Sequence, residues 1–280
     1  MSDFKDAIWL ITGASKGIGL ELTEKMLTEG NRVVATSRNP ESIKQRIGNH
    51  PNLLALKVDL ASVNSVESAV NMAIETFGKI DVVVNNAGYW TVASLEETSD
   101  KEFRQSIDIN LIGTVNVIRS VMPHMRRQKS GHVINISSVA GYAGFASSAS
   151  YTAAKFAVIG LSESLAQEVG PFNIRVTVVA PGVFRTNFLN SGSLQTGKNF
   201  IEDYKTKEKL QLWEQLNGNQ PGDPAKLVQI LKDVPTMDEP PLHLLLGPDA
   251  YQLIVDKREA DRKELEKYKH LTLSTDFDHA

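Results

Sequence analysis

Short runs of apolar residues recur along the chain and alternate with longer segments whose apolar residues are spaced three or four apart. Uninterrupted Val, Ile and Leu runs are typical of strands buried on both faces of a parallel sheet. Alternation of strands and helices over six or more units predicts an α/β fold, a doubly wound parallel sheet with helices on both faces. The predicted strands cover residues 7–12, 32–37, 53–58, 81–86, 132–137, 174–180 and 242–247.

The intervening segments carry helix signals. Ser99 and Glu102 fit a capping box at the start of a helix over 99–127. Small and apolar residues repeat at helical spacing over 151–169. Asp223 and Pro224 suit the N-cap and first position of a further helix. The charged segment 256–270 predicts a solvated helix, since runs of charge are usually exposed faces.

Residues 191–222 differ from the rest because they lack the pattern of a buried strand. We interpret them as an inserted loop and helix that leave the sheet before the last strand returns to it. The expected organisation is a single Rossmann-type domain over 1–280, with a helical extension at 248–280. An amphipathic helix after a small, polar stalk suggests the hypothesis that 191–222 is a mobile lid over a substrate.

Composition narrows the function classes. The 280 residues carry a formal net charge of −3, and 41% of them are hydrophobic, which favours neither nucleic-acid nor membrane-surface binding. The chain has no cysteine, which excludes disulfides and thiolate metal sites, and we expect no metal. It shows neither a signal-peptide pattern nor an apolar run of about 18 residues, so we expect a cytoplasmic protein.

The first predicted strand leads directly into "TGASKGIG" at residues 12–19 and then into a helix. Gly13, Gly17 and Gly19 remove side chains where a backbone would approach a ligand. A helix that begins at Gly17 points free N–H groups and partial positive charge at this turn. The pattern therefore predicts a pyrophosphate site; the alternative is a plain tight turn.

The end of the second strand, "TSRN" at 36–39, indicates which dinucleotide is bound. Sites for NAD usually carry an acidic residue here for the ribose 2′-hydroxyl. This chain has Ser37 and Arg38 instead, with Lys16 in the glycine-rich turn. Two cations and a hydroxyl suit a 2′-phosphate, which favours NADP(H). The alternative is that both cations are merely exposed surface residues.

Five motifs in order give a family resemblance: "TGASKGIG", "NNAG" (85–88), "INISS" (134–138), "YTAAK" (151–155) and "PGVFRT" (181–186). The chain resembles a short-chain dehydrogenase/reductase of the roughly 250-residue class, and "GNQPGDPAK" and "EPPLHLLLG" resemble its 17β-hydroxysteroid-dehydrogenase-like branch. The resemblance implies sheet order 3-2-1-4-5-6-7. It also implies a homodimer or homotetramer formed through the helices at 99–127 and 151–169.

Tyr151 and Lys155 lie four apart on one predicted helix, so both project from one face. A free tyrosine has a pKa of about 10, and we expect the nearby ammonium to lower it, which makes Tyr151 a proton donor or acceptor. Ser138, at the end of a strand, can hydrogen-bond a substrate oxygen where negative charge develops. Alternation would turn Ser137 to the opposite face.

The resemblance implies further roles. Asn110 would help Lys155 relay protons, Lys155 would also hold the nicotinamide ribose, and Thr186 would reach the nicotinamide carboxamide. Asp59 would meet the adenine, although it could instead cap the next helix. The implied cofactor-binding residues are Gly13, Ser15, Lys16, Gly17, Ile18, Gly19, Ser37, Arg38, Asp59, Leu60, Asn86, Ala87, Gly88, Tyr151, Lys155, Pro181, Gly182, Val183 and Thr186.

The expected function is NADP(H)-dependent hydride transfer between nicotinamide and a small-molecule carbonyl or secondary alcohol. One alternative is a non-catalytic NADP-binding regulator, against which the presence of Tyr151, Lys155 and Ser138 counts. Another is a sugar-nucleotide epimerase or dehydratase, but those relatives usually show TGxxGxxG and a larger C-terminal domain. Five aromatic residues near loops suggest an apolar or steroid-like substrate: Trp90, Tyr142, Phe145, Phe188 and Trp213.

Overall fold

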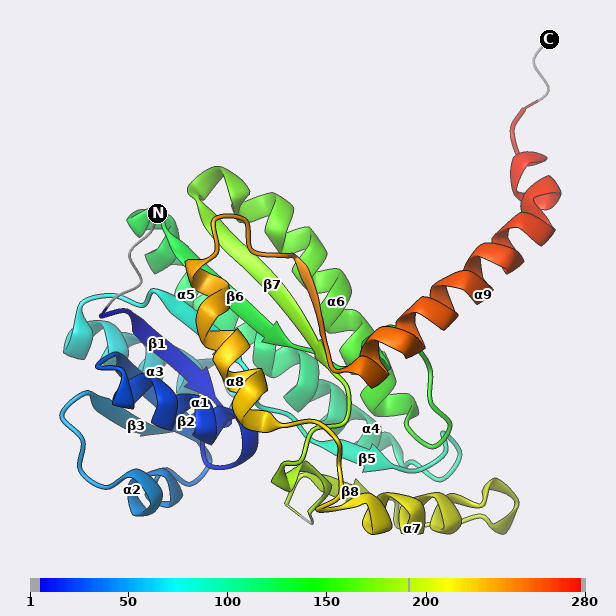
Figure 1. Cartoon of the computed structure of the whole chain (residues 1–280), viewed down its shortest axis with the longest axis horizontal. Coiled ribbons are helices and arrows are strands. Elements are labelled where there is room, and N and C mark those ends of the chain that lie inside the picture. The colour runs from blue at the N-terminus through cyan, green and yellow to red at the C-terminus, as the bar shows by residue number, and fades with distance from the viewer. Residues whose placement is uncertain (1–5, 191, 278–280) are drawn as a thin grey trace.

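The computed structural model describes residues 6–190 and 192–277, and a twisted parallel sheet runs through their centre (Figure 1). Every strand of this sheet was predicted from the sequence, and the predicted strand order is confirmed. In spatial order the seven described strands are β3 (Leu53–Lys57), β2 (Arg32–Ser37), β1 (Ile8–Thr12), β4 (Val82–Asn85), β6 (Gly131–Ile136), β7 (Ile174–Pro181) and β9 (His243–Leu246).

Helices cover both faces of the sheet, because successive strand residues point to opposite faces and both sets are apolar. On one face, Trp9 and Ile11 pack against α1 (Gly17–Thr28), α2 (Glu41–Ile47) and α8 (Pro224–Asp233). On the other face, Leu10 and Val34 pack against α3 (Val63–Phe77), α5 (Gly113–Gln128) and α6 (Ala149–Val169). The strands' carboxyl ends are thereby left open between the helix layers.

The predicted helix over 99–127 is interrupted. It consists of α4 (Asp100–Ile107), a π-helical segment Asp108–Ile112, and α5. The capping box of Ser99 and Glu102 is present at the start of α4. The π segment inserts extra residues at the position of Asn110, and such insertions frequently occur at functional sites.

A second, two-stranded parallel sheet was not predicted. It pairs β5 (Trp90–Val92) with β8 (Leu194–Thr196). The expectation that 191–222 contains no strand is therefore wrong for β8, although the predicted helix is present as α7 (Thr206–Leu216). Residue 191 lies outside the described residues. The pairing ties the inserted segment to the loop that follows β4.

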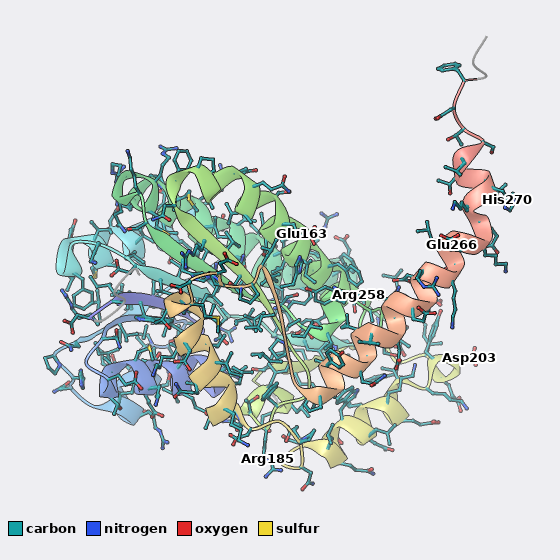
Figure 2. The ribbon with its side chains drawn as sticks, turned by 45° about the horizontal axis from the view of Figure 1, so that its top comes forward. Glu163, Arg185, Asp203, Arg258, Glu266 and His270 are labelled. Carbon is teal, nitrogen blue, oxygen red and sulfur yellow. The ribbon has the colours of Figure 1, made fainter. Side chains whose placement is uncertain are left out.

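The last helix, α9 (Pro248–Leu273), leaves the body of the protein (Figure 1), and Figure 2 shows Glu266 and His270 far from it. Ala250 and Ile254, both in its first two turns, are its buried residues. The solvated helix predicted at 256–270 is confirmed as part of α9. In the part of the chain that the structure describes, no helix is long and apolar enough to cross a bilayer.

Candidate active site

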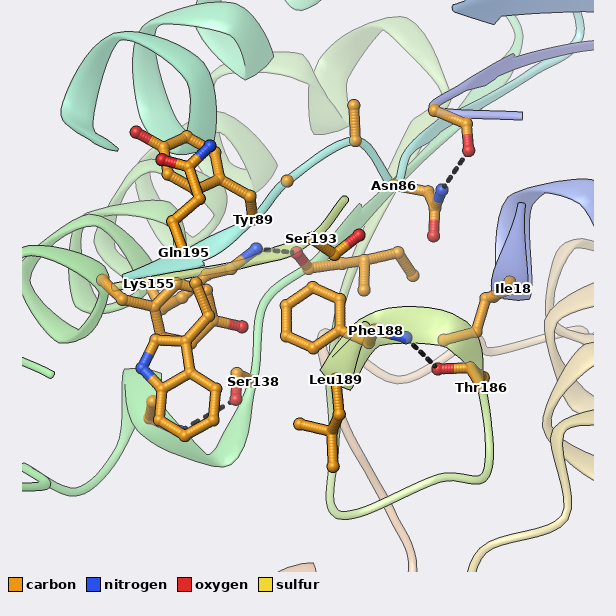
Figure 3. A pocket seen from close by; sticks show the side chains of 18 of the residues that line it. Ile18, Asn86, Tyr89, Ser138, Lys155, Thr186, Phe188, Leu189, Ser193 and Gln195 are labelled. Carbon is orange, nitrogen blue, oxygen red and sulfur yellow. Dashed lines mark hydrogen bonds between the residues drawn. The ribbon is translucent and has the colours of Figure 1, made fainter. Parts of the chain in front are cut away.

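A cavity of about 650 Å³ lies at the carboxyl ends of β1, β2, β4, β6 and β7, where ligands of such sheets bind. All five sequence motifs contribute lining residues. In Figure 3, Ile18, Asn86 and Thr186 lie at one end of the cavity, and Ser138 and Lys155 lie at the other. The fold thus brings together segments that are far apart in the sequence.

The glycine-rich turn is shaped by contacts within the protein. Gly13 has φ +66°, and a Cβ there would lie 2.8 Å from the Cα of Ala87. A Cβ on Gly19 would lie 2.5 Å from Asn86 Nδ2, which donates to the backbone oxygens of Thr12 (2.9 Å) and Gly13 (3.3 Å). Gly13 and Gly19 therefore lack side chains because the "NNAG" segment packs against them, whereas the sequence pattern predicts that a ligand approaches at these positions. Thr12, not predicted, accepts hydrogen bonds at Oγ1 from the N–H groups of Asn86 and Ala87.

Gly17 differs because it leaves space for a ligand. Its φ is +54°, and the nearest atom to a Cβ there would be Thr186 Cβ at 3.6 Å. Gly17 begins α1, whose first turn contains no acidic side chain. The first N–H groups of this helix have no partner in the preceding turn of a helix, so they suit an anion. Ser15, Lys16, Gly17 and Ile18 all line the cavity.

The end of β2 supplies groups that fit a bound phosphate. Ser37 is 8% exposed, and its Oγ is buried without a hydrogen-bond partner in the described residues. Burial, and then the charge of Arg38, lower the pKa of Lys16. Neither cation belongs to an ion pair within residues 6–190 and 192–277. An orphaned hydroxyl and two uncompensated cations at one cavity wall fit a dinucleotide with a phosphorylated ribose.

Asp59 and Leu60 also line the cavity, after the end of β3. Asp59 Oδ1 accepts a hydrogen bond from the N–H of Ala61 (3.1 Å) and so stabilises the turn before α3. The N-cap of α3 is Ser62, not Asp59. Asp59 is therefore placed at the cavity, and the alternative of a helix cap is wrong.

Tyr151 and Lys155 lie on the buried face of α6, with 8% and 4% exposure. Lys155 Nζ donates to the backbone oxygen of Ile136 (2.8 Å) and lies 5.6 Å from the centre of the Tyr151 ring. Ser137 Oγ donates to the backbone oxygen of Lys155 (3.0 Å), which fixes α6 against the end of β6. Ser138 Oγ accepts from the N–H of Ala140 (3.1 Å), and Ser138 lines the cavity.

Burial sets the proton affinities of this group. It raises the pKa of Tyr151 to about 12, partly opposed by a hydrogen bond with Ser138, and it lowers the pKa of Lys155 to about 8. The expectation that Lys155 lowers the pKa of Tyr151 is wrong for this structure, because desolvation disfavours both charged forms. Tyr151 therefore carries its proton at neutral pH.

Asn110, which belongs to the π segment, lies beside Lys155 of α6. Its Oδ1 accepts from the N–H of Tyr89 (3.0 Å), and its Nδ2 donates to the backbone oxygen of Ser106 (2.9 Å). A Cβ on Gly88 would lie 2.7 Å from Asn110 Oδ1 and 3.7 Å from Lys155 Nζ. The carboxamide is thus engaged in holding the loop after β4, and the proton-relay role stays a prediction.

The "PGVFRT" segment is held by a residue that the sequence did not suggest. Asp249, in the first turn of α9, accepts a hydrogen bond at Oδ2 from the N–H of Val183 (2.7 Å). Thr186 Oγ1 accepts from the N–H of Phe188 (3.3 Å; Figure 3). Pro181, Gly182, Val183 and Thr186 all line the cavity. Asp249 thus fixes one wall of the cavity from a distant helix.

Aromatic side chains form the other half of the cavity. Trp90 packs edge-on against Trp213 of α7 (5.0 Å between ring centres) and tilted against Tyr151 (6.3 Å). Phe188 and Phe145 also line it, as expected. Tyr142 does not line it, because its hydroxyl contacts His243 Nδ1 (2.6 Å) outside the cavity.

A buried carboxylate anchors the inserted segment. Glu97, 1% exposed, accepts hydrogen bonds from the N–H of Ile201 (2.8 Å), the N–H of Ser94 (2.7 Å) and the Thr206 hydroxyl (2.7 Å). Burial alone would raise the pKa of Glu97, but these hydrogen bonds outweigh it and lower the pKa to about 2. The segment is thereby fixed over the cavity at its base, while its mobility stays a prediction.

Fold and site together define a nicotinamide-dependent oxidoreductase, and comparisons agree. Residues 7–196 match the short chain dehydrogenase family model, so the chain belongs to this family. It is 37% identical to oxidoreductase BOA17 of Botryotinia fuckeliana, over 96% of this chain and 98% of that one. It is 38% identical to 3-ketodihydrosphingosine reductase of Bacteroides thetaiotaomicron, over 86% and 88%. A short-chain dehydrogenase structure from Streptomyces avermitilis superposes with TM-score 0.89 at 32% identity, covering 96% of this chain and all of that one.

Proposed function

We propose that the protein is an NADP(H)-dependent carbonyl reductase that also oxidises the corresponding secondary alcohol. The observation that carries the proposal is the meeting of Tyr151, Lys155 and Ser138 in a cavity whose other end presents Lys16 and Arg38. The first group suits acid–base chemistry at a carbonyl oxygen, and the second suits a phosphorylated ribose. A relative whose name is 3-ketodihydrosphingosine reductase supports the reduction of a ketone.

In the reducing direction, Tyr151 acts as the general acid. Its pKa of about 12 keeps the phenol protonated at neutral pH, so it can give its proton to the carbonyl oxygen. The Ser138 hydroxyl donates a hydrogen bond to the same oxygen as negative charge develops. Lys155, held by the backbone oxygen of Ile136, stabilises the resulting phenolate. Bound NADPH would supply the hydride.

The phosphate of the cofactor would be held by Lys16, Ser37 and Arg38. Each charge-assisted hydrogen bond is worth about 1.5–3 kcal/mol, so a single one gives at least about a tenfold preference for NADPH over NADH. The glycine-rich turn would hold the pyrophosphate, and the "NNAG" and "PGVFRT" segments would enclose the nicotinamide end.

The remaining expectations concern the substrate and the assembly. The aromatic cavity around Trp90 and Trp213 favours an apolar ketone or aldehyde. Assembly as a homodimer or homotetramer through α4, α5 and α6, a cytoplasmic location and the 17β-hydroxysteroid-dehydrogenase-like branch stay predictions.

The test is a panel of ketones and secondary alcohols assayed with both cofactors. We expect turnover, with kcat/KM at least about tenfold higher for NADPH than for NADH. Ser37→Asp should erode that preference, because a carboxylate repels the phosphate and accepts the ribose hydroxyl. Equal efficiency with both cofactors would contradict the assignment of NADP(H). Cofactor binding without turnover of any substrate would favour the regulator, and turnover of a sugar nucleotide alone would favour the epimerase class.

A further inference from the structure

The substrate half of the cavity contains a cationic side chain among apolar ones. The charged residues that line the cavity within the described chain are Lys16, Arg38, Asp59, Lys155 and Lys209. The first four belong to the cofactor end or to the catalytic group. Lys209 comes from α7, one helical turn before Trp213, and so stands at the aromatic wall.

Lys209 has spare hydrogen-bonding capacity. Its Nζ donates to Ser147 Oγ at 3.3 Å, whereas an ammonium carries three N–H donors. None of the ion pairs found in residues 6–190 and 192–277 includes Lys209. A half-buried cation in an apolar wall has lost part of its hydration, so an anionic ligand at this place gains more than it would in water.

The partner of Lys209 is held in a strained conformation. Ser147 has φ 60°, in the left-handed region that residues with side chains rarely adopt. Its backbone oxygen accepts from the N–H of Ala93 (3.0 Å), and its Oγ contacts Thr206 Oγ1 (3.2 Å). Strained residues of this kind persist where the surroundings fix them, often beside a ligand. Ser147 lines the cavity together with Lys209.

The nearest buried acid does not serve as the partner of Lys209. Glu97 reaches it only through Thr206 and Ser147, and its oxygens already accept hydrogen bonds from Ile201, Ser94 and Thr206. The result is a preorganised ammonium at the cavity wall with donors to offer.

We propose that the substrate carries a carboxylate, several bonds from its reacting carbonyl, that binds to Lys209 and Ser147. Ser147 lies just before Ser148, the N-cap of α6, whereas Tyr151 lies in the first turn of that helix, so the carboxylate and the reacting carbonyl must be separated by an apolar spacer. The spacer would lie along Trp90 and Trp213. The substrate class is therefore a keto acid with an apolar chain. The substrate's carbonyl is inferred from the proposed function, whereas its carboxylate is inferred independently from Lys209 and Ser147.

Binding tests the carboxylate without requiring turnover. Methyl-ketone acids of increasing chain length, and their methyl esters, are titrated into the enzyme–NADP⁺ complex while tryptophan fluorescence is followed. We expect one chain length at which the acid binds about tenfold more tightly than its ester, and Lys209→Met to remove that advantage while leaving the ester's affinity unchanged. The matched control is Lys207→Met, an exposed lysine of the same helix that does not line the cavity.

Lys209→Gln, which keeps a polar end, should behave like Lys209→Met, and thermal melting checks that both variants fold. Equal affinity of wild type for acid and ester at every length, or an unchanged acid affinity in both Lys209 variants, would overturn the inference. Turnover with NADPH separates the two proposals. If acids bind through Lys209 but neither acids nor esters are reduced, the proposed function fails and the carboxylate site stands. If acids and esters are reduced with equal KM, the proposed function stands and the carboxylate site fails.

Discussion

Replacement of Tyr151 by Phe removes the proposed acid while keeping the ring that packs against Trp90 and Phe188. The lost hydroxyl contributes a hydrogen bond with Ser138, so stability should fall by only about 1 kcal/mol. A general acid contributes about 10²–10⁴ in rate, which corresponds to about 3–5 kcal/mol of transition-state stabilisation. We therefore expect kcat for ketone reduction to fall by that factor while the Kd for NADPH changes little.

The assay measures kcat by NADPH absorbance, and cofactor binding by fluorescence, in the same protein. Tyr142→Phe is the matched control, since it removes the hydroxyl of a half-buried tyrosine that contacts His243 outside the cavity. That variant should retain wild-type kcat. Retention of more than about a tenth of kcat by Tyr151→Phe would refute the assignment of Tyr151 as the acid. An equal loss of NADPH binding would show that the variant had lost the site and not the proton.

Further predictions concern Lys155, Glu97 and the inserted segment. Because the pKa of Lys155 is lowered to about 8, kcat/KM for NADPH should fall as the pH rises through about 8 and this cation is lost, and a profile that is flat up to pH 10 would contradict it. Glu97→Ala leaves three donors without acceptors, so hydrogen exchange in 192–216 should be faster in this variant than in wild type. If the segment is a lid, cofactor and substrate should slow hydrogen exchange in 192–216 of the wild type. Since the pKa of Glu97 is depressed to about 2, its contribution to stability is present above pH 4.5 and is lost as the pH falls toward 2. The free energies of unfolding of wild type and Glu97→Ala should therefore converge near pH 2. Equal protection of 192–216 in all of these samples would rule out both the anchor and the lid.

The main sheet could be predicted because each of its strands is an apolar run that needs no knowledge of its neighbours. β5 and β8 could not, because each has three residues and exists only through pairing between Trp90 and Leu194, about a hundred positions apart. The π segment at Asn110 was hidden for a similar reason, since its sequence continues the helical pattern of α4 and α5.

The candidate site was predicted where residue type and spacing carry the chemistry, as in Tyr151 and Lys155. The supporting residues were missed because their type is ordinary and their partners are distant in sequence. Glu97 stands in an acidic pair typical of an exposed surface, yet it is buried by a segment more than a hundred residues later. Asp249 is exposed, and it was missed because its partner, Val183, lies 66 residues earlier in the chain. The predicted direction of the pKa shift of Tyr151 was wrong, because sequence spacing reveals the neighbouring charge but not the extent of burial.

The central claim is that hydride passes from NADPH to a substrate carbonyl in this cavity. The most direct measurement uses NADPH with deuterium at both C4 positions of the nicotinamide, with an apolar ketone or keto acid and purified enzyme, and mass analysis of the alcohol formed. The account predicts deuterium on the carbinol carbon, formed by wild type and nearly absent with Tyr151→Phe. Alcohol without deuterium, or no alcohol from any ketone under conditions where NADPH binds, would contradict it.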